Sequence, residues 1–249
     1  MADEHSADKQ IVNGSEPEVT TPFGVFNFAY LNSPAYQNSP AREEIDELNL
    51  PKVFITAAEK AVKDLDIDKP VSITVMIPSP EDENFIISSL GIGAYTFHND
   101  KIVFQFDPLH PKIIESLTKW QAGQIGHELN HWARGDWYGE ETLLNALIFE
   151  GLATVYEENW GAKNLETPWG HVLTPEQMKE EWAKAKPEMD STNFDYSAWF
   201  FGATDEHPNW TGYSLGTAIV KAYLDLHPDV QMKKLIIKPS KEILQESKF

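Results

Sequence analysis

The feature that most constrains the fold is a change in the spacing of apolar residues near His110. Before it, VSITVMIP (71–78) alternates and is rich in β-branched residues, which predicts a strand. GIGAYTFHNDKIVFQFDP (91–108) has two short β-prone runs around three polar residues, which predicts a hairpin. After His110 apolar residues recur every three or four positions, as in helices. Strands followed by helices indicate an α+β fold.

The helical pattern has recognisable limits. Pro111 suits a first helical turn and Gly135 closes the segment that follows it, while Thr174 with Gln177 has the spacing of a capping box. Ser240 is the expected cap of a short terminal helix. The predicted helical segments are 40–70 (one or two helices), 111–135, 140–159, 174–187, 211–226 and the short one from 240.

Charge and composition narrow the function. The net charge is -19 and the 20 Lys and Arg residues are scattered, which disfavours nucleic acid and anionic membranes as partners. There is no transmembrane segment and no signal peptide, so a cytoplasmic protein is expected, or an exported or lipid-anchored one if a signal has been trimmed. Residues 1–22 are predicted to be a disordered acidic tail, and residues 23–249 one domain of undetermined oligomeric state.

The stretch IGHELNHWARG (125–135) carries the strongest chemical signal. On a helix His127 and His131 lie on one face, and Glu128 is offset by about 100°. Two imidazoles can therefore converge on one ion, with a carboxylate beside it to act as a base. The chain has no cysteine, so a metal must use His, Asp or Glu. This donor set fits Zn²⁺ best, and manganese or cobalt could substitute.

The candidate third ligand is Glu150, in NALIFEGLATVYEE. It lies among apolar residues at helical spacing, so its carboxylate is expected on the apolar face, where it must be paired or bound to a metal. The polar side of the same helix is expected to carry Glu141, Asn145 and Glu158. The 18 residues between His131 and Glu150 suit a turn and a second antiparallel helix.

These motifs resemble known families. HELNH followed by EGLA is similar to the gluzincin metallopeptidases. More closely, GHELNHWAR, TLLNALIFEGLA, WTGYSLGTAIVKAYL and KEILQESKF resemble the bacterial predicted zinc-dependent proteases of the YjaZ type, over roughly residues 50 to 249. The resemblance implies a zincin-like (gluzincin) fold with a small β-sheet and a helical C-terminal part. It also implies zinc on His127, His131 and Glu150, with Glu128 as general base.

The expected reaction is hydrolysis of a peptide or protein substrate by a zinc-activated water that Glu128 deprotonates. The tetrahedral oxyanion then needs a donor. Tyr213 in NWTGYSLG is one candidate, because it stands at a predicted helix start, and a packed aromatic is the alternative. His207 in DEHPNW is the second candidate, with an exposed loop histidine as its alternative.

Other residues near the motif have two interpretations each. Arg134 could bind a substrate carboxylate, although pairing with Asp136 or Glu140 is favoured. Thr154, one turn after Glu150, could orient the Glu150 carboxylate without binding the metal itself. The strand GIGAYTF could receive an extended peptide at a sheet edge, or it could be an ordinary hairpin strand.

The aromatic residues Trp199, Phe200, Phe201 and Trp210 could line a specificity pocket, and core packing is favoured. His98 and His171 are expected at the surface. Two alternatives to a zinc peptidase remain: a hydrolase of a non-peptide amide, and a non-proteolytic zinc-bound scaffold or partner-binding protein. The intact Glu128 argues against a scaffold, because a structural zinc site has no use for a base.

Overall fold

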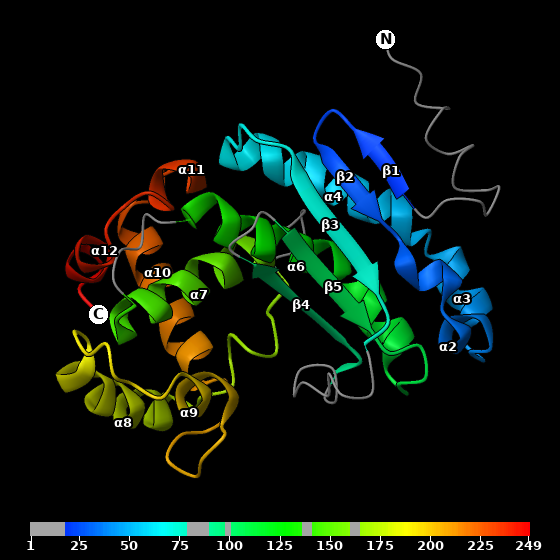
Figure 1. Cartoon of the computed structure of the whole chain (residues 1–249). Coiled ribbons are helices and arrows are strands. Elements are labelled where there is room, and N and C mark those ends of the chain that lie inside the picture. Colours follow the sequence, from blue (N-terminus) through cyan, green and yellow to red (C-terminus); the bar gives the residue numbers. More distant parts are fainter. Residues whose placement is uncertain (1–17, 79–89, 98–100, 136–140, 160–164) are drawn as a thin grey trace. The chain divides into compact units, whose positions relative to one another are not determined.

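The computed structural model describes residues 18–78, 90–97, 101–135, 141–159 and 165–249 (Figure 1). The chain divides into two compact units, one ending at Leu129 and the other beginning at Asn130. The first unit contains a five-stranded sheet, and the regular structure described in the second is helical. The predicted α+β class is confirmed, while the gluzincin fold and a single domain over 23–249 stay predictions.

The sheet of the first unit is mixed, in the order β1-β2-β3-β5-β4 (Figure 1). β1 pairs antiparallel with β2, β2 and β3 are parallel, β3 and β5 are parallel, and β4 pairs antiparallel with β5. The predicted hairpin is therefore confirmed in its strands, and its turn at 98–100 lies outside the described residues. The strands are β1 (Glu18–Thr21), β2 (Gly24–Asn27), β3 (Val71–Met76), β4 (Ile92–Phe97) and β5 (Lys101–Phe106).

One face of this sheet forms the core of the first unit. Phe26 of β2 is in register with Ile73 of β3, which is in register with Ile102 of β5, and all three are buried. Phe104 packs against Phe54 with ring centroids 4.8 Å apart. Alternation of apolar and polar residues in the strands places these side chains on one side, as expected for a sheet covered by helices.

Most of the described helices of the first unit precede β3 in the chain, and α6 follows β5. Segment 40–70, predicted to hold one or two helices, holds two, and Asn49 caps the longer one by accepting from the Lys52 amide. The predicted disordered tail, residues 1–22, is wrong for its last part, because β1 covers Glu18–Thr21. Residues 1–17 lie outside the described residues. The helices are η1 (Ala29–Asn32), α2 (Pro34–Gln37), α3 (Arg42–Glu47), α4 (Leu50–Leu65) and the larger part of α6 (Ile113–Arg134).

Helix α6 continues into the second unit and ends where the sequence predicted, before Gly135 with its positive φ of 44°. The capping box of Thr174 and Gln177 is present. Ser240 is not a cap, however, because Pro239 takes that position and no side chain caps this helix. The remaining elements are α7 (Leu143–Glu158), α8 (Pro175–Ala185), η4 (Lys186–Glu188), α9 (Tyr196–Phe201), α10 (Thr211–Leu226), α11 (Met232–Leu235) and α12 (Ser240–Ser247).

Helices α7 and α10 cross at two glycines. A Cβ on Gly151 would lie 2.3 Å from the backbone of Gly216, and a Cβ on Gly216 would lie 2.0 Å from the carbonyl oxygen of Leu147. Backbone therefore touches backbone at this crossing, and no side chain fits between the helices. Because Gly151 follows Glu150 directly, the crossing also fixes the level at which Glu150 leaves α7.

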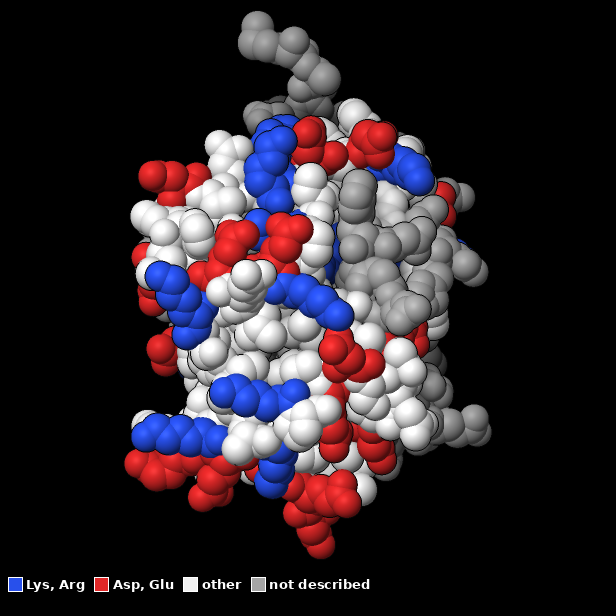
Figure 2. All heavy atoms as spheres, turned by 90° about the vertical axis from the view of Figure 1, so that its left-hand side faces the viewer, with Lys and Arg blue, Asp and Glu red and all other residues white. Residues whose placement is uncertain are grey.

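The surface carries mixed charge. On the face that Figure 2 shows, Lys and Arg side chains lie singly or in small groups among Asp and Glu side chains. This distribution agrees with the scattered lysines of the sequence and gives that face no continuous basic patch for a phosphate backbone. No helix in the described part of the chain has both the length and the apolar character needed to cross a membrane.

Candidate metal centre

Helix α6 brings His127, Glu128 and His131 together. Their side chains are buried, with 7%, 5% and 8% of the residue surface exposed. One ligand atom from each lies within 4.8 Å of the others, and no other group of this kind occurs among the described residues. The donors are two imidazoles and a carboxylate with no sulfur, which is a set that suits zinc. The residues present therefore fit the ion that the sequence predicts.

Glu128 is held by the edge strand of the sheet. The hydroxyl oxygen of Thr96, in β4, lies 2.7 Å from Oε2 of Glu128 and 3.1 Å from its carbonyl oxygen. By donating to Oε2, the hydroxyl of Thr96 restricts the rotation of the Glu128 carboxylate and does not occupy Oε1. Thr96 was missed by the sequence reasoning, although it lies in the strand that was considered as a substrate edge.

Glu150 is buried on α7, as its place among apolar residues predicted. Its Oε2 lies 3.3 Å from Nε2 of His131. The ring of His131 stacks on Phe149, with centroids 4.0 Å apart and planes 13° from parallel. A carboxylate oxygen and an imidazole nitrogen thus face each other from two helices, while the ligand role of Glu150 stays a prediction.

The other oxygen of Glu150 has a partner that the sequence did not indicate. The hydroxyl of Tyr196, at the start of α9, donates to Oε1 at 2.8 Å. The two residues are 46 positions apart, so no helical or strand period links them. The one available signal was the tyrosine beside Asp195, a helix-capping residue type, close to the aromatic run that the sequence analysis singled out.

Tyr213 and His207, the two predicted oxyanion donors, occupy different surroundings. Tyr213 is buried in the first turn of α10 and its ring meets Phe200 edge-on at 5.4 Å. The Nδ1 of His207 lies 2.6 Å from Oε2 of Glu181, and its ring stacks on Trp199 at 3.7 Å. With 8% of its side chain exposed, His207 is not the exposed loop histidine of the alternative interpretation. The catalytic roles of both residues stay predictions.

The interpretation of Arg134 as a substrate-binding residue is wrong. The side chain is fully buried and donates to the carbonyl oxygens of Ile236 at 2.5 Å and Lys238 at 3.3 Å, and to the hydroxyl of Ser240 at 2.9 Å. It therefore ties the end of the motif helix to the C-terminal segment. The acids proposed as its partners, residues 136 and 140, lie outside the described residues.

Core packing, the favoured interpretation of the aromatic run, is confirmed for Trp199 and Phe200, which are both buried. Thr154 is also buried, and a Cβ placed on Gly170 would lie 3.0 Å from its methyl group. Support of Glu150 by Thr154 stays a prediction.

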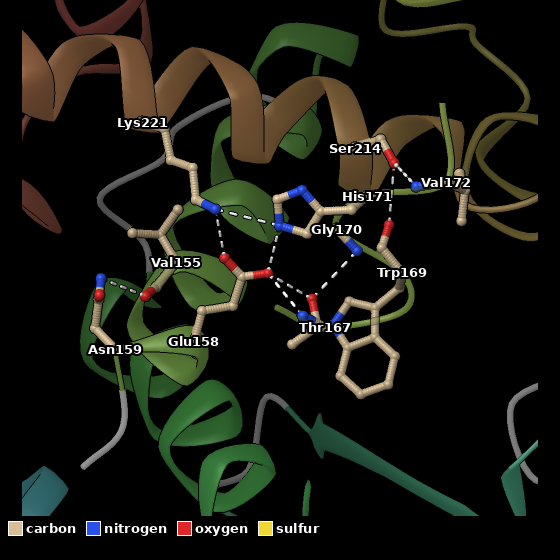
Figure 3. A network of polar contacts seen from close by, with 10 residues as sticks. All are labelled: Val155, Glu158, Asn159, Thr167, Trp169, Gly170, His171, Val172, Ser214 and Lys221. Carbon is tan, nitrogen blue, oxygen red and sulfur yellow. Dashed lines mark hydrogen bonds and ion pairs between the residues drawn. The ribbon is translucent and has the colours of Figure 1, made fainter. Parts of the chain in front are cut away.

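A second polar network lies two turns further along α7 (Figure 3). Glu158 is buried, and its Oε1 accepts from the amide and hydroxyl of Thr167, both at 2.9 Å, and lies 2.7 Å from Nε2 of His171. Its Oε2 pairs with the Lys221 ammonium at 2.8 Å. One prediction is wrong here, because Glu158 is buried and does not lie on a solvated helix face. His171 is a surface residue, as predicted, although its ring also contacts Glu158.

Burial raises the pKa of Glu158, but hydrogen bonds from Lys221 and the Thr167 amide outweigh this effect and lower the pKa below its ordinary value. The carboxyl is therefore ionised at neutral pH, with donors and a cation supplied by the protein itself. This arrangement is that of a structural clasp between α7, the segment 167–172 and α10.

An α+β fold with a buried HExxH group on a long helix defines a class of candidate metallohydrolases. The chain belongs to the family described as Predicted Zn-dependent protease (DUF2268), whose model matches residues 53–245. This match confirms the resemblance to the YjaZ-type proteases and makes zinc the expected metal of the buried group. No curated protein and no solved structure matched the chain in the corresponding comparisons.

Proposed function

We propose that the protein is a zinc-dependent peptidase of the gluzincin type. The observation that carries the proposal is the contact between Oε2 of Glu150 and Nε2 of His131, 3.3 Å apart, next to the buried group on α6. In the proposal His127, His131 and Glu150 hold the zinc. Three protein ligands leave a coordination position open, which distinguishes a catalytic zinc site from a structural one.

Zinc, when bound, supplies a Lewis acid that polarises the scissile carbonyl and makes a water molecule more acidic. Glu128 takes the proton from the attacking water and passes it to the leaving amine. Thr96 supports this role because its hydroxyl contacts Oε2 and leaves Oε1 as the basic oxygen. No covalent intermediate with the protein is required.

The substrate in this proposal is an extended peptide along β4. Among the described strands β4 pairs with β5 alone, so it forms an edge of the sheet. Gly93 is buried, whereas Ala94 is partly exposed and has a small side chain that permits another backbone to approach. Thr96 lies in the same strand, which links the peptide-binding edge to the general base. Tyr213 and His207 are the two donors offered for the oxyanion.

The test is cleavage of a mixed peptide library, read by mass spectrometry, by the zinc-loaded protein and by Glu128→Gln at equal zinc content. We expect the variant to cleave at least about 100-fold more slowly than the wild type, because a positioned general base contributes this much or more. Glu115→Gln is the matched control, since Glu115 is an exposed carboxylate on the same helix. Equal zinc binding without cleavage by the wild type would contradict the proposal and favour a scaffold.

A further inference from the structure

The two carboxylate oxygens of Glu150 have different partners. Oε1 accepts from the tyrosine hydroxyl at 2.8 Å, whereas Oε2 lies 3.3 Å from Nε2 of His131. The oxygen near the imidazole is thus the one that Tyr196 does not contact. A carboxylate held in this way presents one oxygen toward Nε2 of His131.

Tyr196 is itself fixed by its neighbours. Asp195 caps α9 by accepting from the amide of Ala198 at 3.0 Å, which sets the backbone at Tyr196. The tyrosine ring stacks on Phe200, with centroids 4.3 Å apart and planes 16° from parallel, and Phe200 is fully buried. A ring held on a buried neighbour loses little further entropy when its hydroxyl makes a hydrogen bond.

The partner of the other oxygen is fixed as well. The ring of His131 lies flat against Phe149, the residue that precedes Glu150 on α7. The imidazole and the carboxylate are therefore both prevented from rotating, one by a stacked ring and the other by a hydroxyl. Groups that orient metal ligands in this way raise metal affinity by about 10–100-fold.

We propose that Tyr196 is a positioning residue that makes Glu150 a one-oxygen zinc ligand through Oε2. This inference rests on the proposed function, in which Glu150 is the third ligand. A carboxylate free to turn can bind zinc through both oxygens and occupy the position that the attacking water needs. By holding Oε1, Tyr196 keeps that position open.

The experiment compares Tyr196→Phe with the wild type in zinc affinity and in the visible spectrum of the cobalt-substituted protein. Phenylalanine keeps the ring stacked on Phe200 and removes only the hydroxyl. We expect zinc affinity to fall about 10-fold. We also expect weaker cobalt absorption bands, because a second carboxylate oxygen raises the coordination number.

Tyr36→Phe is the matched control. Tyr36 lies in α2 and its hydroxyl donates to the carboxylate of Asp46, so this variant also removes a tyrosine–carboxylate hydrogen bond, at a distance in sequence from the motif. It should keep wild-type zinc affinity and the wild-type cobalt spectrum. Thermal unfolding of the metal-free variants checks that each one folds.

Wild-type zinc affinity and an unchanged cobalt spectrum in Tyr196→Phe would overturn the inference. If that variant does not fold, zinc X-ray absorption on the wild type decides instead, since one carboxylate oxygen on zinc is expected and two would contradict the inference. Failure of the proposed function has a different signature: Glu150→Gln would then bind zinc as tightly as the wild type.

Discussion

Helix α7 carries three buried glutamates, and two of them, Glu150 and Glu158, have contrasting partners. Glu158 accepts hydrogen bonds from Thr167, contacts the imidazole of His171 and pairs with the ammonium of Lys221, so the protein balances its negative charge. Glu150 receives a tyrosine hydroxyl on one oxygen and faces the imidazole of His131 with the other. The comparison teaches that burial alone does not identify a ligand. Both carboxylates contact an imidazole, and what distinguishes them is the ammonium and backbone amide at Glu158 and the tyrosine hydroxyl at Glu150. In the proposed function only Glu150 is a metal ligand.

The largest expected effect separates the two residues by zinc affinity. Glu150→Gln should weaken zinc binding by more than about 100-fold, because removal of a ligand exceeds the loss caused by removal of a supporting group. Glu158→Gln should leave it unchanged. Zinc titration against a competing chelator measures both. Equal losses in the two variants would erase the distinction between them.

The free energy of unfolding of the metal-free protein should depend more on Glu158 than on Glu150. Glu158→Gln should lower the free energy of unfolding of the metal-free protein by about 1–3 kcal/mol, because buried donors lose a charged acceptor. Lys221 is 40% exposed at its side chain, so water can solvate its ammonium and limits the cost. Denaturant titration of the metal-free proteins gives the value, with Glu150→Gln as the comparison. A metal-free Glu158→Gln variant as stable as the wild type would show that the network is not a clasp.

A smaller loss is expected at the crossing that lies between the two glutamates. Gly216→Ala would place a Cβ 2.0 Å from the carbonyl oxygen of Leu147, so α7 and α10 must separate. Overpacking of this kind costs up to about 3 kcal/mol, and the higher helix propensity of alanine offsets about 1 kcal/mol of it. We expect a net loss of about 1–2 kcal/mol in denaturant titration. A stabilised variant would contradict the close contact of the helices.

The smallest effect is a pH dependence of the Glu158 clasp. The folded-state pKa of Glu158 lies below its ordinary value of 4.5. A depressed carboxyl pKa contributes stability above the unfolded-state value, and that contribution is lost as the pH falls through the lower, folded-state pKa. The difference in melting temperature between the metal-free wild type and Glu158→Gln should therefore shrink from pH 7 toward pH 3. A difference that grows over this range would contradict the assignment.

The sequence predicted the parts of the fold that have a local signal. β3 alternates over six residues, α8 has its capping box, and α10 has the bounds that its apolar period indicated. β1 and β2 were missed because four residues are too few to establish an alternation. The positions of His127, Glu128 and His131 on one helix follow directly from their spacing.

The residues that support the candidate centre had no such signal. Tyr196 and Thr96 reach Glu150 and Glu128 from elements 46 and 32 residues away in the chain, and only the folded chain brings them close. Glu158 was placed on the wrong face because the segment that covers it, around Thr167, is irregular and has no period to read. The period of apolar residues predicts which residues share a helix face, but not which distant segment of the chain packs against that face.

The most direct test of the metal centre is the anomalous signal of zinc in crystals of the zinc-loaded protein, recorded on both sides of the zinc absorption edge. We expect one strong peak within bonding distance of nitrogens of His127 and His131 and of Oε2 of Glu150, with no peak at Glu158. A zinc peak at the Glu158 network, or a site at the two histidines that excludes Glu150, would contradict this account.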